Sequence, residues 1–322
     1  MKKIKILIVG WGKIAYGEGE IDKNSHFSAI KFLNNKTILS GISEIKKKKY
    51  PKGFSDILIQ RNLNLAIKKT TPDVISVCTP TNTHFKIVKS ILFNKFKTKI
   101  IFLEKPCFNN YDEFKKIHRL IKKKKTKIII NHSRRFNFNF LRLRNLIKQK
   151  KFGKLKRVNF FYYNGFKNNA VHFIDLLYYL FNDRIKVLEV KKSLEQDKNN
   201  ININVVLKFR KLKSIIYGYG FSQKPFQIFD IDFHFEKKRI LVKNFSEEFC
   251  SYSVIKNRLN ENVLNSKKNL FKNLNPNVPM INAYNLICNY LNFKKNFQYL
   301  RNIDLLSAKK TMKTIYEIEK KI

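Results

Sequence analysis

Short apolar, β-branched runs alternate with amphipathic segments through the first 130 residues of the chain. Residues 6–9, 38–42, 74–78 and 100–103 have the composition of buried parallel strands, and residues 128–131 form a fifth such run. The segments between them contain helical periodicity, such as Phe85, Val88, Ile91 and Leu92. Alternation of strand and helix is typical of a doubly wound parallel sheet, so we predict one for residues 1–133.

The pattern changes after Phe136, where strand-like runs become dominant. After a predicted helix near 140–149, the candidate strands are residues 158–163, 187–190, 201–209, 214–221, 226–235 and 239–242. Several alternate apolar with polar residues, which predicts a mostly antiparallel sheet with one covered face. Residues 257–279 have the composition of a loop, and helices are predicted at 282–293 and 305–320. We therefore expect a second domain of the α/β class over residues 134–322.

The run at residues 6–9 leads directly into a glycine turn, Gly10-Trp11-Gly12-Lys13-Ile14-Ala15. Strand, glycine turn and helix start occur in the order that a dinucleotide-binding unit requires. Gly10 permits a turn that no side chain could occupy, Gly12 allows close approach of a pyrophosphate, and Ala15 lets the helix lie on the strand. The anion would then contact free N–H groups at the helix start. The alternative is a plain strand–turn–helix.

Glu44 follows the second predicted strand, where an acid holds the adenosine ribose hydroxyls in dinucleotide-binding domains. The alternative is a surface carboxylate at a strand end. Lysines at residues 46–49 could accept a 2′-phosphate, so the sequence predicts NAD and leaves NADP open.

Two further strand ends carry polar residues. Thr79-Pro80-Thr81, with His84, follows the third predicted strand, and Glu104-Lys105-Pro106 follows the fourth. Because α/β sheets bind ligands at the carboxyl ends of their strands, we expect both loops to face one crevice. Lys105 stands between an acid and a stiffening proline, which favours a functional role over that of one more surface lysine.

A second group of polar residues lies at a predicted helix start in the second half. Asn168, His172 and Asp175 are spaced i, i+4 and i+7, which places them on one face of an α-helix. An imidazole between an amide and a carboxylate could be a positioned proton carrier. The alternative is a capping asparagine beside a satisfied, semi-buried histidine.

The charge of the chain is strongly positive. Its 322 residues include 67 Lys and Arg against 23 Asp and Glu, a formal net charge of +44. A polyanion partner is one interpretation. The lysines are spread over every segment, however, with runs at residues 46–49 and 122–125, so we attribute the charge to compositional drift. We expect salt-sensitive, non-specific adhesion to polyanions and no specific nucleic-acid partner.

The cysteine pattern and the hydropathy bear on location. The four cysteines show neither paired spacing nor a zinc pattern, so we expect a reducing cytoplasm and no metal. No run approaches the roughly 20 apolar residues that a membrane span needs, and Lys5 interrupts the first apolar run.

Together these motifs resemble the glucose–fructose oxidoreductase / inositol dehydrogenase (Gfo/Idh/MocA) family over about two-thirds of the chain. The resemblance implies a Rossmann domain followed by an α/β domain whose large open sheet often mediates oligomers, here a dimer or tetramer. It implies NAD(P)-dependent redox chemistry on a sugar, polyol or sugar nucleotide. It also implies roles for individual residues. Lys105 and His172 would be the catalytic pair, with Asn168 beside them, and Arg135, Asn169 and Asp175 would lie at the substrate. The residues implied at the cofactor are Gly10, Trp11, Gly12, Lys13, Ile14, Ala15, Glu44, Thr79, Pro80, Thr81, His84, Glu104 and Lys105.

One position departs from the family. Many active members carry an aspartate where this chain has Asn168. An amide can orient a substrate hydroxyl but cannot accept its proton, so proton transfer would fall to His172 while Lys105 polarises the oxygen. The Asn168-Asn169-Ala170 version resembles a branch associated with bacterial surface-polysaccharide biosynthesis. We predict hydride transfer; the alternative is a non-catalytic dinucleotide- or sugar-sensing protein on the same fold.

Overall fold

The computed structural model of the protein describes residues 2–17, 24–48, 50–51, 53–94, 96–197, 200–265, 268–271, 278–293 and 303–322. The chain folds into two compact units, the first built from residues 1–137 and 277–309 and the second from 138–276 and 310–322. This division differs from the single boundary expected after residue 133. The chain enters its second unit four residues later than expected, and a C-terminal segment returns to the first unit.

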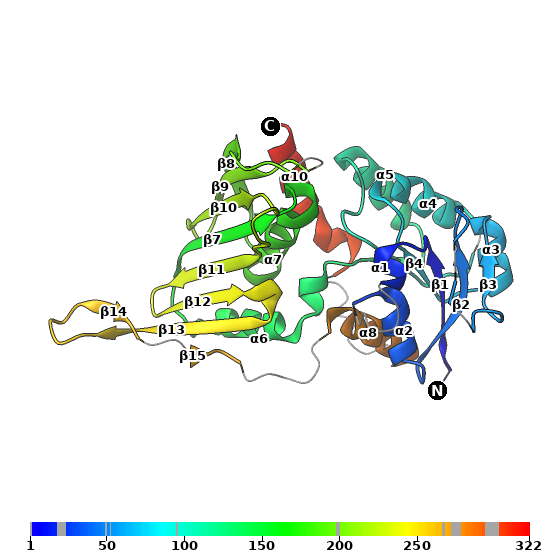
Figure 1. Ribbon diagram of the computed structural model, residues 1–322, viewed down its shortest axis with the longest axis horizontal. Coiled ribbons are helices and arrows are strands. Elements are labelled where there is room, and N and C mark those ends of the chain that lie inside the picture. The colour runs from blue at the N-terminus through cyan, green and yellow to red at the C-terminus, as the bar shows by residue number, and fades with distance from the viewer. Residues whose placement is uncertain are drawn as a thin grey trace. The chain divides into compact units, whose positions relative to one another are not determined.

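The first unit is a parallel sheet (Figure 1). Among the described residues it has six strands in the order β3-β2-β1-β4-β5-β6. The strands are β1 Ile4–Val9, β2 Thr37–Ser43, β3 Leu58–Gln60, β4 Val74–Val77, β5 Ile100–Leu103 and β6 Lys127–Ile130. The order reverses between β1 and β4, which is the switch point where such sheets bind dinucleotides.

Helices cover both faces of this sheet. They are α1 Lys13–Tyr16, α2 His26–Phe32, α3 Leu63–Thr70, α4 Thr81–Phe93, α5 Tyr111–Ile121 and α8 Pro279–Phe293, with a 3₁₀ turn, η1, at Ser133–Phe136. Helices α2 and α8 pack together on one face, while α3, α4 and α5 lie on the other (Figure 1). Apolar side chains of α8, including Ile281 and Ile287, join those of β1 and α2 in one core, which explains why this segment belongs to the first unit.

The second unit is organised on a mixed sheet. Within the described ranges it has nine strands in the order β14-β13-β12-β11-β7-β10-β9-β8, with β15 paired to β13. The strands are β7 Leu155–Tyr163, β8 Ile185–Lys192, β9 Ile203–Phe209, β10 Ile215–Phe221, β11 Asp230–Phe235, β12 Lys238–Lys243, β13 Glu248–Lys256, β14 Asn262–Leu264 and β15 Lys268–Asn269. All pairs are antiparallel except β7 with β10. The predicted, mostly antiparallel sheet is confirmed.

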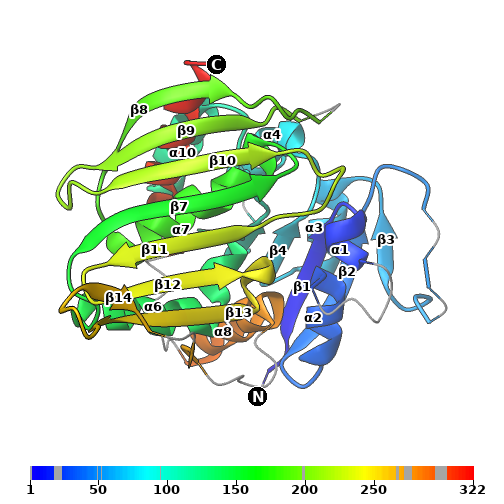
Figure 2. The same cartoon turned by 60° about the vertical axis from the view of Figure 1, so that its left-hand side comes forward.

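One face of this sheet is covered by helices and the other is open (Figure 2). The covering helices are α6 Phe138–Lys148, α7 Val171–Phe181 and α10 Leu305–Glu319, and short helical turns lie at η2 Phe166–Ala170 and η3 Asn244–Ser246. On the covered face Phe160 stacks on Phe173, which stacks on Phe229. On the open face Phe161 of β7 stacks on Tyr219 of β10, with ring centroids 5.5 Å apart.

The structure adds elements to the predicted set. The sequence pattern did not predict β3, or β13 at Glu248–Lys256. The expected loop at 257–279 contains β14 and β15, and its residues 266–267 and 272–277 lie outside the described part of the chain. In the described ranges, no helix is sufficiently long and apolar to cross a bilayer.

Candidate active site

The glycine turn after β1 has the geometry that its sequence predicts. Gly10 has φ +87°, and a Cβ added to it would lie 2.7 Å from Cγ2 of Thr79. Both the backbone conformation and the close approach of the β4 loop therefore require glycine. A Cβ added to Gly12 would meet nothing within 4 Å. The turn thus presents open space to one side of Gly12, as a bound pyrophosphate requires.

Helix α1 follows this turn as a single helical turn. Ala15 is fully buried against the first sheet, whereas Lys13 and Ile14 are exposed. The small side chain at Ala15 lets the backbone lie close to β1, as expected. We propose Lys13 and Ile14 as cofactor contacts because they lie next to the turn.

Glu44 joins the end of β2 to the glycine turn. Its Oε2 accepts the backbone N–H of Trp11 at 2.7 Å, and its Oε1 accepts the N–H of Lys46 at 2.9 Å. A carboxylate offers about four acceptor positions, so two protein donors leave capacity for ribose hydroxyls. The carboxylate therefore lies at the carboxyl ends of β1 and β2, beside the switch point between β1 and β4, where a dinucleotide needs it. Lys49 of the neighbouring lysine run lies outside the described residues.

The Trp11 side chain packs away from solvent in an aromatic cluster. The four rings around it are Tyr16, Phe27, Tyr50 and Phe54. Its Nε1 has no hydrogen-bond partner in the described part of the chain. The residue contributes its backbone to the turn, and its ring anchors the loop that follows β2.

The His84 side chain hydrogen-bonds to the loop after β4. The imidazole is 0% exposed, with Nε2 2.8 Å from the Thr79 carbonyl oxygen and Nδ1 3.1 Å from that of Cys107. Burial lowers the pKa of His84, so the ring is neutral and donates to one carbonyl at a time. His84 thus connects the Thr79 loop to the loop after Lys105. Pro80 caps the start of α4 and Thr81 is its first residue.

Lys105 lies directly after β5, on the loop that His84 supports. Its side chain is partly buried, and the peptide bond to Pro106 is cis. Burial lowers the pKa of Lys105 to about 8, helped by the positive charge of Arg134 and opposed by the carboxylate of Glu104. The amine therefore changes its charge close to neutral pH.

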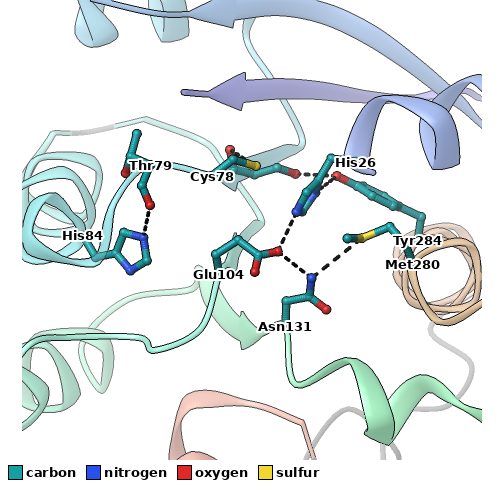
Figure 3. A network of polar contacts seen from close by, with 9 residues as sticks. His26, Cys78, Thr79, His84, Glu104, Asn131, Met280 and Tyr284 are labelled. Atoms are coloured by element: carbon teal, nitrogen blue, oxygen red, sulfur yellow. Dashed lines mark hydrogen bonds and ion pairs between the residues drawn. The ribbon is translucent and has the colours of Figure 1, made fainter. Parts of the chain in front are cut away.

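Glu104 is buried beneath this loop (Figure 3). Its Oε1 accepts from Asn131 Nδ2 at 2.5 Å and lies 2.8 Å from Nε2 of His26. Burial would raise the pKa of Glu104, but the hydrogen bond and the charge interaction with His26 outweigh it, together with the bond from Asn131 and the charge of Lys105, and lower that pKa. Glu104 points into the protein, so we expect it to act on the cofactor site through the loop.

The expected histidine motif in the second unit has a different local geometry. Residues Phe166–Ala170 form a π-helical turn, and α7 begins only at Val171. Asn168 therefore precedes the α-helix that contains His172, and the predicted i, i+4 spacing on one α-helical face does not apply to this pair. Gly165, with φ +86°, starts the turn.

The remaining members of this motif are largely buried. His172 is 9% exposed, with its ring edge-on to Phe229, and Asp175 is 1% exposed and accepts from Thr311 Oγ1 at 3.0 Å. Asn169 donates to the Tyr163 carbonyl oxygen at 2.8 Å. Asp175 and Asn169 thus make structural contacts within their unit, so their proposed substrate roles depend on interactions beyond these.

Arg135 also has a structural partner. It is 3% exposed, and its Nη1 donates to Ser307 Oγ at 3.0 Å within the first unit. The adjacent Arg134 is the one whose charge acts on Lys105.

Sequence reasoning missed several residues, namely His26, Asn131 and Tyr284 in the network at Glu104 and Arg134 near Lys105. Asn131 ends a predicted strand at the carboxyl edge of the sheet, and this position was the available signal for it. His26 and Tyr284 are 258 residues apart, and nothing in the local pattern connects them. In the described ranges, no three His, Cys, Asp or Glu side chains gather as a metal ion requires.

Comparison with known proteins agrees with this geometry. Residues 4–132 match the model of the Gfo/Idh/MocA oxidoreductase family with an NAD-binding Rossmann fold. An uncharacterized oxidoreductase of Schizosaccharomyces pombe is 25% identical over 159 residues, which are 48% of this chain and 40% of the relative. The match thus spans about two-fifths of the length of that curated relative.

Solved structures share the whole fold. A super-repressor mutant of Gal80p from Saccharomyces cerevisiae has a TM-score of 0.80 at 16% identity, covering 99% of this chain and 96% of its own. The WlbA dehydrogenase of Bordetella pertussis, solved with NADH and UDP-GlcNAcA, has a TM-score of 0.76 at 16% identity with the same coverage. At these identities the likeness establishes the two-domain fold.

Proposed function

We propose that this chain, whose residues 4–132 match the NAD-binding Gfo/Idh/MocA oxidoreductase family, transfers a hydride between nicotinamide and a hydroxyl or keto carbon of a sugar nucleotide or related sugar. The observation that carries the proposal is the composition of the carboxyl edge of the first sheet. The glycine turn and Glu44 at β1 and β2 fit a dinucleotide, and Lys105 lies on the same edge at β5.

Each of these residues in the first unit has a separate proposed role. Gly12 leaves room for the pyrophosphate, and Glu44 accepts from ribose hydroxyls while it holds the turn through Trp11. The nicotinamide supplies the hydride acceptor or donor. Lys105, as an ammonium, stabilises the negative charge that develops on the substrate oxygen. The Thr79 and Lys105 loops are fixed relative to one another through His84.

His172 is the proposed proton acceptor. Its ring lies edge-on to Phe229 and is 9% exposed, so little of it is open to water. Asn168 would orient the substrate hydroxyl without taking its proton. This assignment predicts that His172 and Lys105 have separate kinetic roles, one in proton transfer and one in charge stabilisation.

A sugar nucleotide is the substrate class that we favour. The WlbA structure of the same fold was solved with a sugar nucleotide, and the positive charge of this chain suits an anionic substrate. Surface-polysaccharide biosynthesis is the proposed setting. We also propose that the open face of the second sheet, with Phe161 and Tyr219, mediates a homo-oligomer.

Gal80p gives a second candidate function a specific basis. A super-repressor mutant of Gal80p shares this fold, and Asn168 stands where many active family members carry an acid. In that case the protein would bind a dinucleotide as a sensor without turning over a sugar.

The test is turnover of a panel of UDP-sugars and their uronic acids, followed by the change in NADH absorbance. We expect at least one substrate to be converted with stoichiometric change in the cofactor. Mass spectrometry of small molecules that co-purify with the protein selects the panel without bias. Binding of NADH without any redox change across the panel favours the sensor, and Asn168→Asp then tests whether an acid restores turnover.

A further inference from the structure

A cavity of about 290 Å³ lies beside the edge strand β6 of the first unit. Its walls come from the end of α5, the amino end of β6 and the start of α10, and all of the lining residues belong to the first unit. The volume is close to the ~300 Å³ at which small-molecule sites begin. One acid, Asp304, lines the cavity, against five basic residues, namely His118, Lys122, Lys124, Lys125 and Lys127.

The end of α5 explains only part of this basic lining. The helix ends at Ile121, and positive side chains at a helix C-terminus are stabilised by its dipole. Lys127, however, belongs to β6 and lines the same cavity. In the part of the chain that the structure describes, Lys122, Lys124 and Lys125 form no ion pair. Several cations therefore surround one cavity and repel one another, which a bound anion would relieve.

The imidazole of His118 is held in place at this cavity. It stacks on Phe114, one turn earlier in α5, with ring centroids 6.0 Å apart and an angle of 11° between the planes. Phe114 is itself buried in the core. Burial lowers the pKa of His118, and the positive charges of Lys122 and Lys309 lower it further. The charge of Asp304 opposes them, so the ring responds to charges in and around the cavity.

Two other charged groups of the lining are positioned by contacts of their own. The Lys127 ammonium lies 5.9 Å from the centroid of the Tyr290 ring. Asp304 Oδ1 accepts the backbone N–H of Ser307 at 2.9 Å, at the start of α10. Asp304 thus has a structural role in that helix, and its single charge does not balance the four lysines.

We propose that this cavity binds a small anion of the phosphate class, a phosphate ester or pyrophosphate, through Lys122, Lys125 and Lys127. Lysine ammonium groups bind phosphate as point charges. The apolar side chains of Ile121 and Leu306, which also line the cavity, suit the organic part of an ester. The volume is that of about ten water molecules, which fits a compound of this size and excludes a dinucleotide.

The location separates this site from the proposed cofactor site. Lys127 is the first residue of β6, whereas Glu44 and Lys105 follow the carboxyl ends of β2 and β5. All six strands of the first sheet are parallel, so their amino and carboxyl ends lie at opposite edges. The inference therefore does not rest on the proposed function.

The experiment titrates the whole protein with inorganic pyrophosphate and follows the imidazole signals by NMR. Salt at about 0.15 M weakens non-specific attraction between charges. The signal that is lost in His118→Gln assigns His118. We expect pyrophosphate to shift this signal saturably and to raise the titration midpoint of His118, because a nearby anion favours imidazolium. A signal unchanged at about 10 mM pyrophosphate, tenfold above a millimolar Kd, would overturn the proposal.

Two matched pairs of substitutions distinguish a site from the general positive charge. Lys122→Gln with Lys125→Gln removes two charges from the cavity, and Lys68→Gln with Lys69→Gln removes two from exposed positions at the end of α3. We expect the first pair to weaken pyrophosphate binding at least about tenfold and the second to leave it little changed. Equal weakening by both pairs, or unchanged binding in the first pair, would refute a specific site.

A last arm repeats the titration with saturating NADH. The separate location predicts the same response of His118 with and without NADH. If NADH abolishes the response, pyrophosphate binds at the glycine turn and the proposal fails. A protein that binds pyrophosphate as described but does not bind NADH would support this inference and reject the proposed function.

Discussion

The backbone N–H of Trp11 donates to Glu44 Oε2 at 2.7 Å, which ties the glycine turn to the end of the neighbouring strand. The same carboxylate is the group expected at the adenosine ribose. In our proposal the cofactor site is formed by the carboxyl ends of the paired strands β1 and β2, which this side chain connects.

Replacing Glu44 by glutamine should change cofactor choice more than fold. The amide oxygen still accepts from Trp11, but the loss of charge weakens the bonds to the ribose. NADH affinity should fall about tenfold, since a bond to a charged group contributes about 1.5 kcal/mol. The affinity for NADPH should rise relative to that for NADH, because the variant side chain no longer repels the 2′-phosphate. Fluorescence titration with both cofactors measures this, with Glu113→Gln as the control. Equal losses for both cofactors would argue against the ribose assignment.

Substitutions at the two glycines of the turn should have different effects, one on stability and one on cofactor binding. Gly10→Ala forces a positive φ on an L-residue and drives a methyl group into Thr79, so stability should fall by at least about 1–2 kcal/mol. Gly12→Val fills space that is open in the protein, so the melting temperature should stay near wild type while NADH binding is lost. Thermal unfolding and NADH titration of both variants test the contrast. Tight NADH binding by Gly12→Val would mean that the pyrophosphate lies elsewhere.

The pH dependence of turnover follows from the pKa of Lys105, about 8. The protonated amine is the active form in this account, so kcat/KM should fall as pH rises through about 8. Lys105→Arg keeps its charge at high pH, so any residual activity of this variant should lack that decline. A rate that rises through pH 8 would instead identify Lys105 as a base.

The packing of the second unit gives a stability prediction. A Cβ on Gly218 of β10 would collide with the ring of Phe160, so Gly218→Ala should cost about 1–3 kcal/mol. In the double variant with Phe160→Leu, the loss should be smaller than the sum of the single losses, because the colliding atom is gone. Denaturant unfolding of the four proteins measures the coupling. Strict additivity would show that the two residues do not share this space.

Much of the first unit could be predicted from sequence because its signals are local. Buried strand runs, the glycine turn and the capping residue Asn110 of α5 each act within a few residues, and Asn110 does accept the Glu113 N–H. The membership of α8 in the first unit was not predictable in this way. Its apolar stripe shows that it packs against something, but not against which sheet.

There are also physical reasons why other parts of the fold and the site were not predicted. Strand β13, Glu248–Lys256, mixes serine, cysteine and charge without clean alternation, so no strand was expected there. The π-helical turn before α7 depends on Gly165, whose Cβ would lie 2.5 Å from Cβ of Asn200 in a distant segment. The role of Glu104 depends on His26, Asn131 and Tyr284, which converge only in the folded protein.

The central claim is that Lys105 takes part in a hydride transfer. The direct measurement is the rate of NADH absorbance change in Lys105→Met with a substrate that the wild-type protein converts. Lys116→Met, which changes an exposed lysine of α5, is the matched control. We predict a loss of at least about a hundredfold in kcat for Lys105→Met, with NADH affinity little changed and Lys116→Met like wild type. A Lys105→Met protein that turns over at the wild-type rate would contradict the account.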